Sequence, residues 1–342
     1  MKTRIKDIAK ALGVSPSTVS KALNNKPGVN PELRKKIIET AKQFGYEKDI
    51  FANYLKTRRT GIIGLIIPDV SNYFFGKLVL SIEKTLYEKG YRYVLFNTDE
   101  NEEKEIEYLQ TSLSYGVEGI ITVTAARSNK RKLLNLYKKF PLSNKPVVFV
   151  DRVLESLGAS YVILDNIGAA FEAVEYLYKH GHKKIGVIMG PKGVYTAEKR
   201  LEGFFKALDM LGLKCKEEWI IKGEFSINIT EKSVTKVFRK TKDHPTALIA
   251  FNNLMAIGAL EALNNLGLSV PDDVSIITFD DMPWHKFLKV SLTSISQPIE
   301  EMGILAASVL LSELENPESK KSRVVLKGQL VERSSVSNLT LQ

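Results

Sequence analysis

The sequence predicts an α/β protein in which an N-terminal three-helix headpiece precedes two doubly wound lobes, each built on a parallel sheet. Three observations predict this fold. Residues 1–45 carry apolar residues at helical spacing, and from Gly61 onward short apolar runs alternate with amphipathic helical stretches. The α/β pattern breaks near residues 151–160, which divides it into two similar parts. The 342 residues of the chain also exceed what one hydrophobic core usually supports.

Three short helices are expected in the headpiece. Gly13 and Gly45 stand where the first and third helices would end, and Ser15 and Pro16 suit the cap and the first position of the second. Because only a short turn separates the first two helices, the segment is typical of a helix-turn-helix whose second helix turns its polar face outward. The apolar residues at helical spacing are Ile5, Ile8, Ala9, Leu12, Val19, Ala22, Leu23, Leu33, Ile37, Ile38, Ala41 and Phe44.

The positive charge of the chain is concentrated in the same segment. Residues 1–60 contain 14 Lys and Arg against 5 Asp and Glu, a net charge of +9, whereas the other 282 residues contain 35 against 34 and carry +1. A concentrated positive charge suits a polyanion, because each phosphate that it neutralises releases condensed counterions. A solvated basic face on a generic three-helix scaffold is the alternative interpretation.

The second helix offers hydrogen-bonding and cationic side chains on its outward face, as the readout of base edges and nearby phosphates requires. We therefore predict that this helix and its flanks bind DNA. The predicted DNA-binding residues of the headpiece are Ser15, Pro16, Ser17, Thr18, Ser20, Lys21, Asn24 and Asn25.

From Gly61 the apolar runs predict strands and the amphipathic stretches predict helices, so repeated β-α-β units should form parallel sheets that are covered on both faces. The expected strands are residues 62–67, 91–96, 119–123, 147–150, 161–164, 185–189, 219–221, 247–251 and 274–279. The expected helices include residues 76–89, 102–115, 168–180, 197–211 and 254–266. A helix over residues 299–314 and a last strand over residues 323–330 are available to cross back between the lobes.

Ligands of open α/β sheets bind at the carboxyl ends of the strands, and two facing lobes turn that edge into a cleft. Aromatic, carboxylate, amide and guanidinium side chains follow the expected strands, which suits a polyhydroxylated ligand whose ring stacks and whose hydroxyl pairs need fixed donors and acceptors. Capping of the following helix is the alternative role for each Asp or Asn. These residues are Asn72, Tyr73, Phe74, Phe75, Asp99, Asp151, Arg152, Asp165, Asn166, Thr196, Arg200, Phe225, Asn252, Asn253, Asp280 and Asp281.

Several ordered motifs resemble those of the lactose-repressor/galactose-repressor family of bacterial transcription factors, over nearly the whole chain. The most specific of them is IKDIAKALGVSPSTVSKALN at residues 5–24. The others are NYFF at 72–75, HGHKKI at 180–185, RLEGF at 200–204, VPDDVS at 270–275, FDD at 279–281 and LTSISQP at 292–298.

The resemblance implies lobes of the periplasmic-binding-protein type and a homodimer that binds a pseudo-palindromic operator, usually as a repressor. We place the headpiece at residues 1–47, the hinge helix at 48–60 and the effector-binding and dimerisation domain at 61–342. Within that domain, we expect a first lobe at about 61–160 and 291–320 and a second at about 161–290 and 321–334. In the hinge, the resemblance assigns Leu55 to the minor groove with Lys56 beside it. Asn53 is included as a DNA contact, at a position where arginine is common.

The resemblance also implies a small effector between the lobes, with Arg200 and Asp280 holding adjacent hydroxyls and two phenylalanines flanking the ring. Val194 and Ser226 lack the basic and acidic groups expected for a purine co-repressor, which favours a sugar. Combined with the strand-end positions, the predicted effector-binding residues are Phe74, Asp99, Asp151, Asp165, Thr196, Arg200, Phe225, Asn252, Asp280 and Gln297.

Other classes of protein fit less well. No glycine-rich phosphate loop, nucleophile elbow or catalytic carboxylate pair can be assigned, so we expect neither an enzyme nor a cofactor. His180 and His182 have no third ligand nearby, and Cys215 is the single cysteine, so we expect no metal site. A periplasmic sugar-binding protein would share the two lobes. The N-terminus lacks a signal-peptide pattern, however, and no run of about 18 apolar residues occurs, so we expect a cytoplasmic, nucleoid-associated protein.

Overall fold

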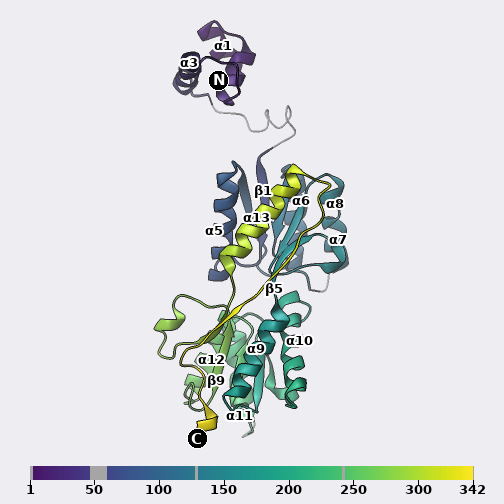
Figure 1. Ribbon diagram of the computed structural model, residues 1–342, viewed down its shortest axis with the longest axis vertical. Coiled ribbons are helices and arrows are strands. Elements are labelled where there is room, and N and C mark those ends of the chain that lie inside the picture. The colour runs from purple at the N-terminus through teal and green to yellow at the C-terminus, as the bar shows by residue number, and fades with distance from the viewer. Residues whose placement is uncertain (1–2, 47–59, 128–129, 241–242, 342) are drawn as a thin grey trace. The chain divides into compact units, whose positions relative to one another are not determined.

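The chain forms two compact units, Met1–Thr60 and Gly61–Gln342. A computed structural model describes residues 3–46, 60–127, 130–240 and 243–341 (Figure 1). Separate hydrophobic clusters stabilise the two units, one in the first and three in the second. Among the described helices, none is long and apolar enough to cross a membrane.

In the first unit, helices α1 (Ile5–Leu12), α2 (Pro16–Leu23) and α3 (Pro31–Gln43) enclose a small core. Gly13 ends α1 with φ +63°, a left-handed conformation that glycine adopts at little cost, and the chain turns directly into α2. Ser15 caps α2, since its Oγ accepts a hydrogen bond from the Thr18 backbone N–H at 3.1 Å, and Pro16 takes the first helical position. The helix-turn-helix that the sequence predicts is confirmed.

The first lobe of the second unit contains a six-stranded sheet in the order β11-β5-β4-β3-β1-β2, and every pair in it is parallel. Its strands are β1 (Ile62–Ile67), β2 (Arg92–Asn97), β3 (Gly119–Thr122), β4 (Val147–Val150), β5 (Ser160–Leu164) and β11 (Arg323–Leu326). Its helices are α5 (Tyr73–Glu88), α6 (Glu102–Ser114), α7 (Lys130–Tyr137), α8 (Lys139–Leu142), α13 (Ile299–Glu315) and the short η1 (Glu155–Leu157). Because α5 and α13 share one apolar cluster and α6 and α7 share another, helices cover the sheet in layers (Figure 1).

The second lobe repeats this arrangement with a sheet in the order β12-β10-β9-β8-β6-β7, in which only the edge strand β12 is antiparallel to its neighbour. Its strands are β6 (Ile185–Met189), β7 (Ile220–Lys222), β8 (Ala247–Ala250), β9 (Ser275–Phe279), β10 (Thr293–Ser296) and β12 (Gln329–Val331). Its helices are α9 (Asn166–Lys179), α10 (Tyr195–Met210), α11 (Ile227–Lys240), α12 (Asn253–Asn265) and the short η2 (Glu217–Trp219), η3 (His285–Phe287) and η4 (Leu339–Leu341). Helix α9 packs against α10, and α11 packs against α12.

The structure changes three of the expected lobe assignments. Strands β5 and β11 belong to the first sheet, although most of β5 and all of β11 fall in segments that we expected in the second lobe, and β10 belongs to the second sheet instead of the first. The single strand expected over residues 323–330 is two strands in different sheets. A Cβ on Gly328, between them, would lie 3.0 Å from Ile295 Cγ2. Apolar runs in the sequence indicate strands, but they do not indicate where the chain passes from one sheet to the other.

The chain therefore crosses between the lobes three times, after β5, after β10 and after β11. Two of these crossings are joined by a hydrogen bond, because the Asp165 backbone N–H donates to the Leu326 carbonyl at 2.8 Å. These three connections join the two lobes on the side where the parallel strands of both sheets end (Figure 1). The candidate site lies there.

Candidate functional site

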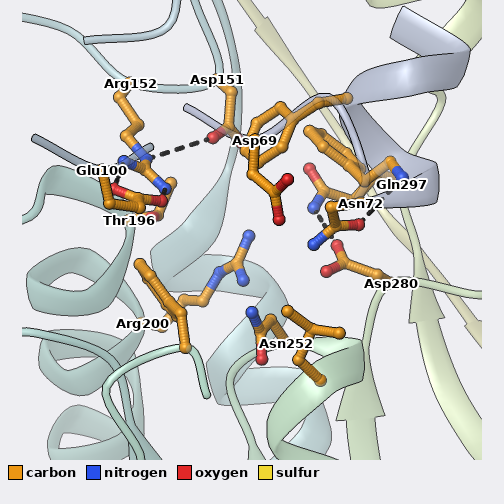
Figure 2. Close-up of a pocket in the computed structure, with 14 residues that line it drawn as sticks. Asp69, Asn72, Glu100, Asp151, Arg152, Thr196, Arg200, Asn252, Asp280 and Gln297 are labelled. Atoms are coloured by element: carbon orange, nitrogen blue, oxygen red, sulfur yellow. Dashed lines mark hydrogen bonds and ion pairs between the residues drawn. The ribbon is translucent and has the colours of Figure 1, made fainter. Parts of the chain in front are cut away.

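A cavity of about 60 Å³ lies between the lobes at the carboxyl ends of their parallel strands, and we call it the inter-lobe cleft (Figure 2). Residues from the first lobe that line it are Asp69, Asn72, Phe74, Phe75, Glu100, Asp151 and Arg152. Residues from the second lobe are Thr196, Arg200, Phe225, Asn252, Leu254 and Asp280, with Gln297 directly after β10. Pockets for drug-sized ligands span about 300–1,000 Å³, so this cleft is much smaller than such a pocket.

Tight backbone turns point several of these side chains into the cleft. Glu100, Asp151, Phe225 and Asp280 have φ angles of +53°, +63°, +55° and +70°, in the left-handed region that favours glycine. Such residues cost on the order of 1–3 kcal/mol each and cluster at binding sites. Asp151 and Asp280 directly follow β4 and β9, so the strained turns lie where the sheets end.

Arg200 is a buried cation that forms no ion pair with any described residue. Its Nε donates to Asn166 Oδ1 at 2.8 Å, its Nη1 donates to the Phe251 carbonyl, and its guanidinium carbon lies 4.1 Å from the centroid of the Phe279 ring. These contacts fix the orientation of the guanidinium group, and the carboxylates that act on it, Asp280 and Asp151, lie beyond ion-pair distance. Figure 2 shows the guanidinium group facing the carboxylate of Asp280 across the open space.

Across the open space from Arg200, a polar wall is formed by Asp280, Gln297 and Asn252. Asp280 Oδ1 accepts a hydrogen bond from Gln297 Nε2 at 2.6 Å, whereas the buried Gln297 Oε1 has no partner among the described residues. Asn252 caps α12, because its Oδ1 accepts from the Met255 backbone N–H at 2.9 Å, and this leaves its Nδ2 available to a ligand. An unsatisfied buried polar atom costs about 1–3 kcal/mol, which a ligand hydroxyl would recover.

Arg152, in contrast, is already paired. Its two terminal nitrogens donate to the two carboxylate oxygens of Glu100, each at 2.7 Å, and its Nε lies 3.6 Å from Asp151 Oδ2 (Figure 2). The contact between Arg152 and Glu100 is bidentate, the geometry that makes arginine–carboxylate pairs strong. Among the described residues, Arg152 Nε has no hydrogen-bond partner.

Negative charge exceeds positive charge around the cleft, because four carboxylates accompany two guanidinium groups. The carboxylates belong to Asp69, Glu100, Asp151 and Asp280. Burial raises the pKa of Asp151 to about 6 and also raises the pKa of Asp280, against the opposing effect of nearby arginines. Burial alone would also raise the pKa of Glu100, but the Arg152 guanidinium outweighs it and the pKa is lowered. A site of this charge favours a neutral hydrogen-bond donor over an anion.

Aromatic rings form the apolar walls. Phe74 and Phe75 pack edge to face with centroids 5.1 Å apart, and Phe225 approaches from the second lobe. The Phe225 ring depends on Gly190, because a Cβ there would lie 2.2 Å from Phe225 Cε1. The apolar faces of a sugar ring pack on aromatic faces of this kind, and its hydroxyls then point to polar groups at the ring edge.

The structure brings most of the predicted effector-binding residues to this one cleft. Phe74, Asp151, Thr196, Arg200, Phe225, Asn252, Asp280 and Gln297 line it, as do Asn72, Phe75 and Arg152 from the strand-end set. The sequence did not indicate Asp69, Glu100 or Leu254. Each of these lies one to three residues from a strand end or a helix start, so only the conformation of its loop shows which residue faces the cleft.

Two predicted positions, Asp99 and Asp165, do not line the cleft and are removed from the candidate set. The Asp99 side chain is 74% exposed and lies 3.3 Å from Lys104 Nζ, because the left-handed turn at residues 99 and 100 points Glu100 inward instead. Asp165 Oδ1 accepts a hydrogen bond from the Gly168 backbone N–H at 2.9 Å and caps α9. Helix capping was the alternative role of such residues.

In the headpiece, α2 turns its apolar side to the core and its polar side outward. Pro16, Ser17 and Lys21 are exposed. Ser15 is exposed as well, but its Oγ lies 2.7 Å from Ser17 Oγ and 2.8 Å from Thr18 Oγ1, so the hydroxyls at the start of the helix are linked. This cluster presents donors and acceptors from a fixed helix end.

The turn after α2 is held by an arginine that the sequence did not indicate. Arg34 of α3 donates to Asn25 Oδ1 at 2.8 Å and to the Lys26 carbonyl at 2.6 Å. Asn24 Nδ2 donates back to the Ser20 carbonyl at 2.8 Å. Asn24 and Asn25 therefore use part of their hydrogen-bonding capacity within the headpiece. The predicted hinge contacts Asn53, Leu55 and Lys56 lie outside the described residues.

In the described part of the chain, no three His, Cys, Asp or Glu side chains are grouped as metal ligands. His180 Nδ1 lies 2.8 Å from the Tyr176 carbonyl, and His182 lies within hydrogen-bonding distance of Thr246 and Ser337. Both histidines are thus engaged in local structure.

An outward-facing helix-turn-helix, joined to two lobes with a polar cleft between them, defines a DNA-binding regulator with a ligand-binding domain. Comparisons with known proteins agree. Residues 4–49 match the family described as "Bacterial regulatory proteins, lacI family", and residues 174–336 match a "Periplasmic binding protein-like domain".

Relatives match along almost the full chain. The HTH-type transcriptional regulator DegA of Bacillus subtilis is 32% identical over 339 residues, which is 99% of either chain. The ribose operon repressor of Halalkalibacterium halodurans is 34% identical over 97% of both chains, and the HTH-type transcriptional repressor PurR of Proteus mirabilis is 32% identical over 98% of this chain and 97% of its own. The chain belongs to the lacI family of bacterial regulatory proteins.

Solved structures show the same fold. The Lac repressor dimer bound to operator and an anti-inducer superposes with a TM-score of 0.87 at 22% identity, and covers 98% of this chain and 100% of its own. A lacI-family regulator from Enterococcus faecium with bound ribose has a TM-score of 0.72 at 28% identity, over 81% of this chain and 99% of its own.

Proposed function

We propose that the protein represses transcription by binding operator DNA as a homodimer, and that a neutral sugar in the inter-lobe cleft controls its operator affinity. One observation carries the sugar assignment. Arg200 and Asp280, both from the second lobe, face each other across the open space without an ion pair, and each is oriented by other residues. A pair of adjacent hydroxyls supplies both the acceptor that Arg200 lacks and the donor that Asp280 can use.

Other features of the cleft support a neutral sugar over a charged ligand. Carboxylates outnumber guanidinium groups, and phenylalanine rings form two walls. The relatives include a ribose operon repressor and a regulator with bound ribose, which makes a pentose the first sugar to test.

A purine co-repressor is the second candidate for this family. Val194 is fully buried and apolar, and Ser226 Oγ accepts a hydrogen bond from the Ile229 backbone N–H at 3.4 Å, so neither supplies a charged group for a purine. Purines therefore belong in the same binding assay as a direct competitor of the sugar hypothesis.

On the DNA side, we assign base and phosphate contacts to the exposed face of α2, with Ser17, Ser20 and Lys21 as its hydrogen-bonding and cationic groups. Ser15, Pro16 and Thr18 set the start of this helix. The hinge residues Asn53, Leu55 and Lys56 complete the assignment as minor-groove contacts, with the leucine as the wedge.

Coupling between the two functions follows from the position of the cleft. A ligand there contacts both lobes, so it binds more tightly to the lobe arrangement that brings both walls within reach. In a homodimer, a change in lobe angle alters the spacing of the two headpieces and hence their joint fit to the two half-sites of an operator.

The proposal includes no catalytic step and no cofactor, because the cleft groups are arranged to hold a ligand. Binding to chromosomal operators also requires a cytoplasmic, nucleoid-associated protein. A sugar recovered unchanged after prolonged incubation with the protein would agree with this assignment, whereas turnover would contradict it.

The proposal is tested in two stages. Thermal denaturation of the full chain with pentoses, hexoses, guanine and hypoxanthine identifies the effector, since a ligand at 100 times its Kd stabilises the native state by about 2.7 kcal/mol. Operator DNA is then selected from a randomised pool, and its affinity is measured with and without that ligand by fluorescence anisotropy. We expect a sugar to stabilise the protein and to change operator affinity about tenfold or more. Stabilisation by purines alone, or unchanged operator affinity at saturating sugar, would contradict the proposal.

A further inference from the structure

A second cavity, of about 300 Å³, adjoins the inter-lobe cleft, and we call it the outer cavity. Arg152 lines both spaces. Two chain segments also pass from one space to the other: Asp151 lines the cleft and Val153 the outer cavity, and Thr196 lines the cleft and its neighbour Tyr195 the outer cavity. The two spaces therefore lie on either side of the Arg152 side chain. The outer cavity offers much more room than the cleft of about 60 Å³.

Both lobes build the outer cavity. The first lobe contributes Thr124, Ala126, Val153, Leu154, Glu155 and Ser156, and the second contributes Gly193, Tyr195, Glu198 and Lys199. The lobes touch beside it, because a Cβ on Gly193 would lie 3.0 Å from the Arg127 carbonyl oxygen. The Tyr195 ring packs against the apolar cluster of the first lobe. A ligand in this cavity would contact both lobes, as a ligand in the cleft does.

The walls of the outer cavity combine an aromatic face with hydrogen-bonding groups. Tyr195 is half-buried, and Val153 and Leu154 add apolar surface. Glu155 and Ser156 are exposed at the wall, and neither side chain has a hydrogen-bond partner among the described residues. The buried Arg152 also lines this cavity. Aromatic surface next to free donors and acceptors is the combination that binds sugar rings.

The charges of the outer cavity argue against an anionic ligand. Glu155 and Glu198 oppose Lys199, whose Nζ is 3.3 Å from Glu202, and the terminal nitrogens of Arg152 are occupied by Glu100. A phosphate or carboxylate would meet more negative than available positive charge. A neutral hydroxylated group meets no such cost and can donate to the glutamates.

We propose that the effector is at least a disaccharide, with one sugar ring in the inter-lobe cleft and the adjoining unit in the outer cavity. This inference rests on the proposed function, because it extends a sugar already assigned to the cleft. Arg152 lines both spaces, so its side chain lies beside the linkage between the two units. The second unit determines specificity, since a bare monosaccharide leaves Glu155 and Ser156 without ligand partners.

Calorimetric titration of the full chain with matched sugar pairs tests the inference. The probes are xylose with xylobiose, glucose with maltose and cellobiose, galactose with lactose and melibiose, and ribose alone. Hydrogen bonds to charged groups are worth about 1.5–3 kcal/mol, so we expect at least one disaccharide to bind about tenfold or more tightly than its own monosaccharide. If every disaccharide binds no more tightly than its monosaccharide, the inference is wrong while the proposed function stands. If no sugar binds, both fail.

Two variants locate the second unit. Ser156→Trp fills the outer cavity from an exposed position and should weaken disaccharide binding about tenfold or more, with monosaccharide affinity unchanged. Ser143→Trp places the same ring on an exposed site of the same lobe, after α8, and should change neither affinity. Glu155→Ala, which removes an exposed side chain and cannot block the cleft, should also weaken only the disaccharide. Equal losses for monosaccharide and disaccharide in Ser156→Trp or Glu155→Ala, or no loss in either of these two variants, would overturn the inference.

Discussion

Two buried arginines face the inter-lobe cleft from opposite lobes, and their surroundings differ. Arg152 forms a two-pronged ion pair with Glu100 and lies beside Asp151, whereas Arg200 is oriented by an amide, a carbonyl and an aromatic ring and forms no ion pair among the described residues. Both are 3% exposed. The difference separates two uses of one residue type: a charge whose partner belongs to the fold, and a charge whose partner is left to the ligand.

The comparison teaches that the fold pairs the terminal nitrogens of Arg152 with a carboxylate, whereas Arg200 has no ion-pair partner among the described residues. A buried ion pair is costly to break, because removing one partner leaves the other charge without compensation. A buried cation held only by neutral groups is costly to bury but gains from an incoming acceptor. Replacing Arg152 should therefore mainly lower stability, whereas replacing Arg200 should mainly weaken ligand binding.

The largest effect is expected for Arg152→Met. Loss of the guanidinium leaves Glu100, 21% exposed, without its main partner, which should lower the free energy of unfolding by about 3 kcal/mol. Chemical denaturation, followed through the unfolding transition of the second unit, measures this change in free energy. Adding Glu100→Gln to the same chain should restore most of the lost stability, and a double variant as unstable as Arg152→Met would contradict the ion-pair explanation.

The next largest effect is expected for Arg200→Met, and it falls on binding instead of stability. Truncating a charged group that the ligand contacts costs about 2–5 kcal/mol, so sugar affinity should fall about 100-fold or more. The same variant should still bind operator DNA, but without a response to sugar. Calorimetry and fluorescence anisotropy check the two expectations. An Arg200→Met protein that binds sugar normally would show that the open guanidinium is not the ligand's partner.

A smaller effect is expected from pH, through the carboxylate beside Arg152. The pKa of Asp151 is raised from 3.8 to about 6 in the folded protein, so ionising this group makes the folded state less stable as pH rises between those values, with no further change above them. A sugar hydroxyl that donates to Asp151 binds the ionised form more tightly, because a charged acceptor forms the stronger hydrogen bond. Sugar affinity should therefore rise with pH up to about 6 and be about tenfold weaker at about pH 5 than at its plateau.

Titrations at several pH values, with the wild-type chain and Asp151→Asn, measure this dependence. The asparagine variant should lose most of the pH dependence, because its side chain does not ionise. The pKa of Asp280 is also raised, so sugar affinity in the asparagine variant should keep a weaker dependence on pH. Parallel profiles in the two proteins would rule out Asp151 as the titrating group.

The smallest effect is expected in the headpiece, where Lys21 is exposed on α2 and forms no ion pair with any described residue. Water already solvates its charge, so Lys21→Gln should weaken operator binding only about three- to tenfold. The slope of log affinity against log salt should drop by about 0.9 if Lys21 neutralises one phosphate. Lys236→Gln, in the second lobe, removes the same charge outside the headpiece and serves as the control. Equal effects of both variants would argue against a phosphate contact at Lys21.

Residue types and strand ends predicted most of the cleft, because parallel strands bring their carboxyl ends to one edge whatever the details of the loops. Phe74, Arg200 and Asp280 were predictable for this reason. The sequence could not distinguish Asp99 and Asp165 from these cleft residues, because a carboxylate after a strand can face a ligand, cap a helix or point to solvent. The left-handed turn at Asp99 and Glu100, and the cap of α9 at Asp165, are properties of loops that sequence periodicity does not encode.

The sequence by itself determined the helix-turn-helix, the alternation of strands and helices and the family of this protein, because these depend on local spacing and on motifs that are short and ordered. The tertiary structure decided which sheet each late strand joins, that Glu100 neutralises Arg152 and that Arg200 is left open. Glu100 and Arg152 are 52 residues apart, and Asn72 meets Asn253 across the cleft at a separation of 181. Such pairs are set by the way the lobes pack, so only their positions in space reveal which charges remain for a ligand.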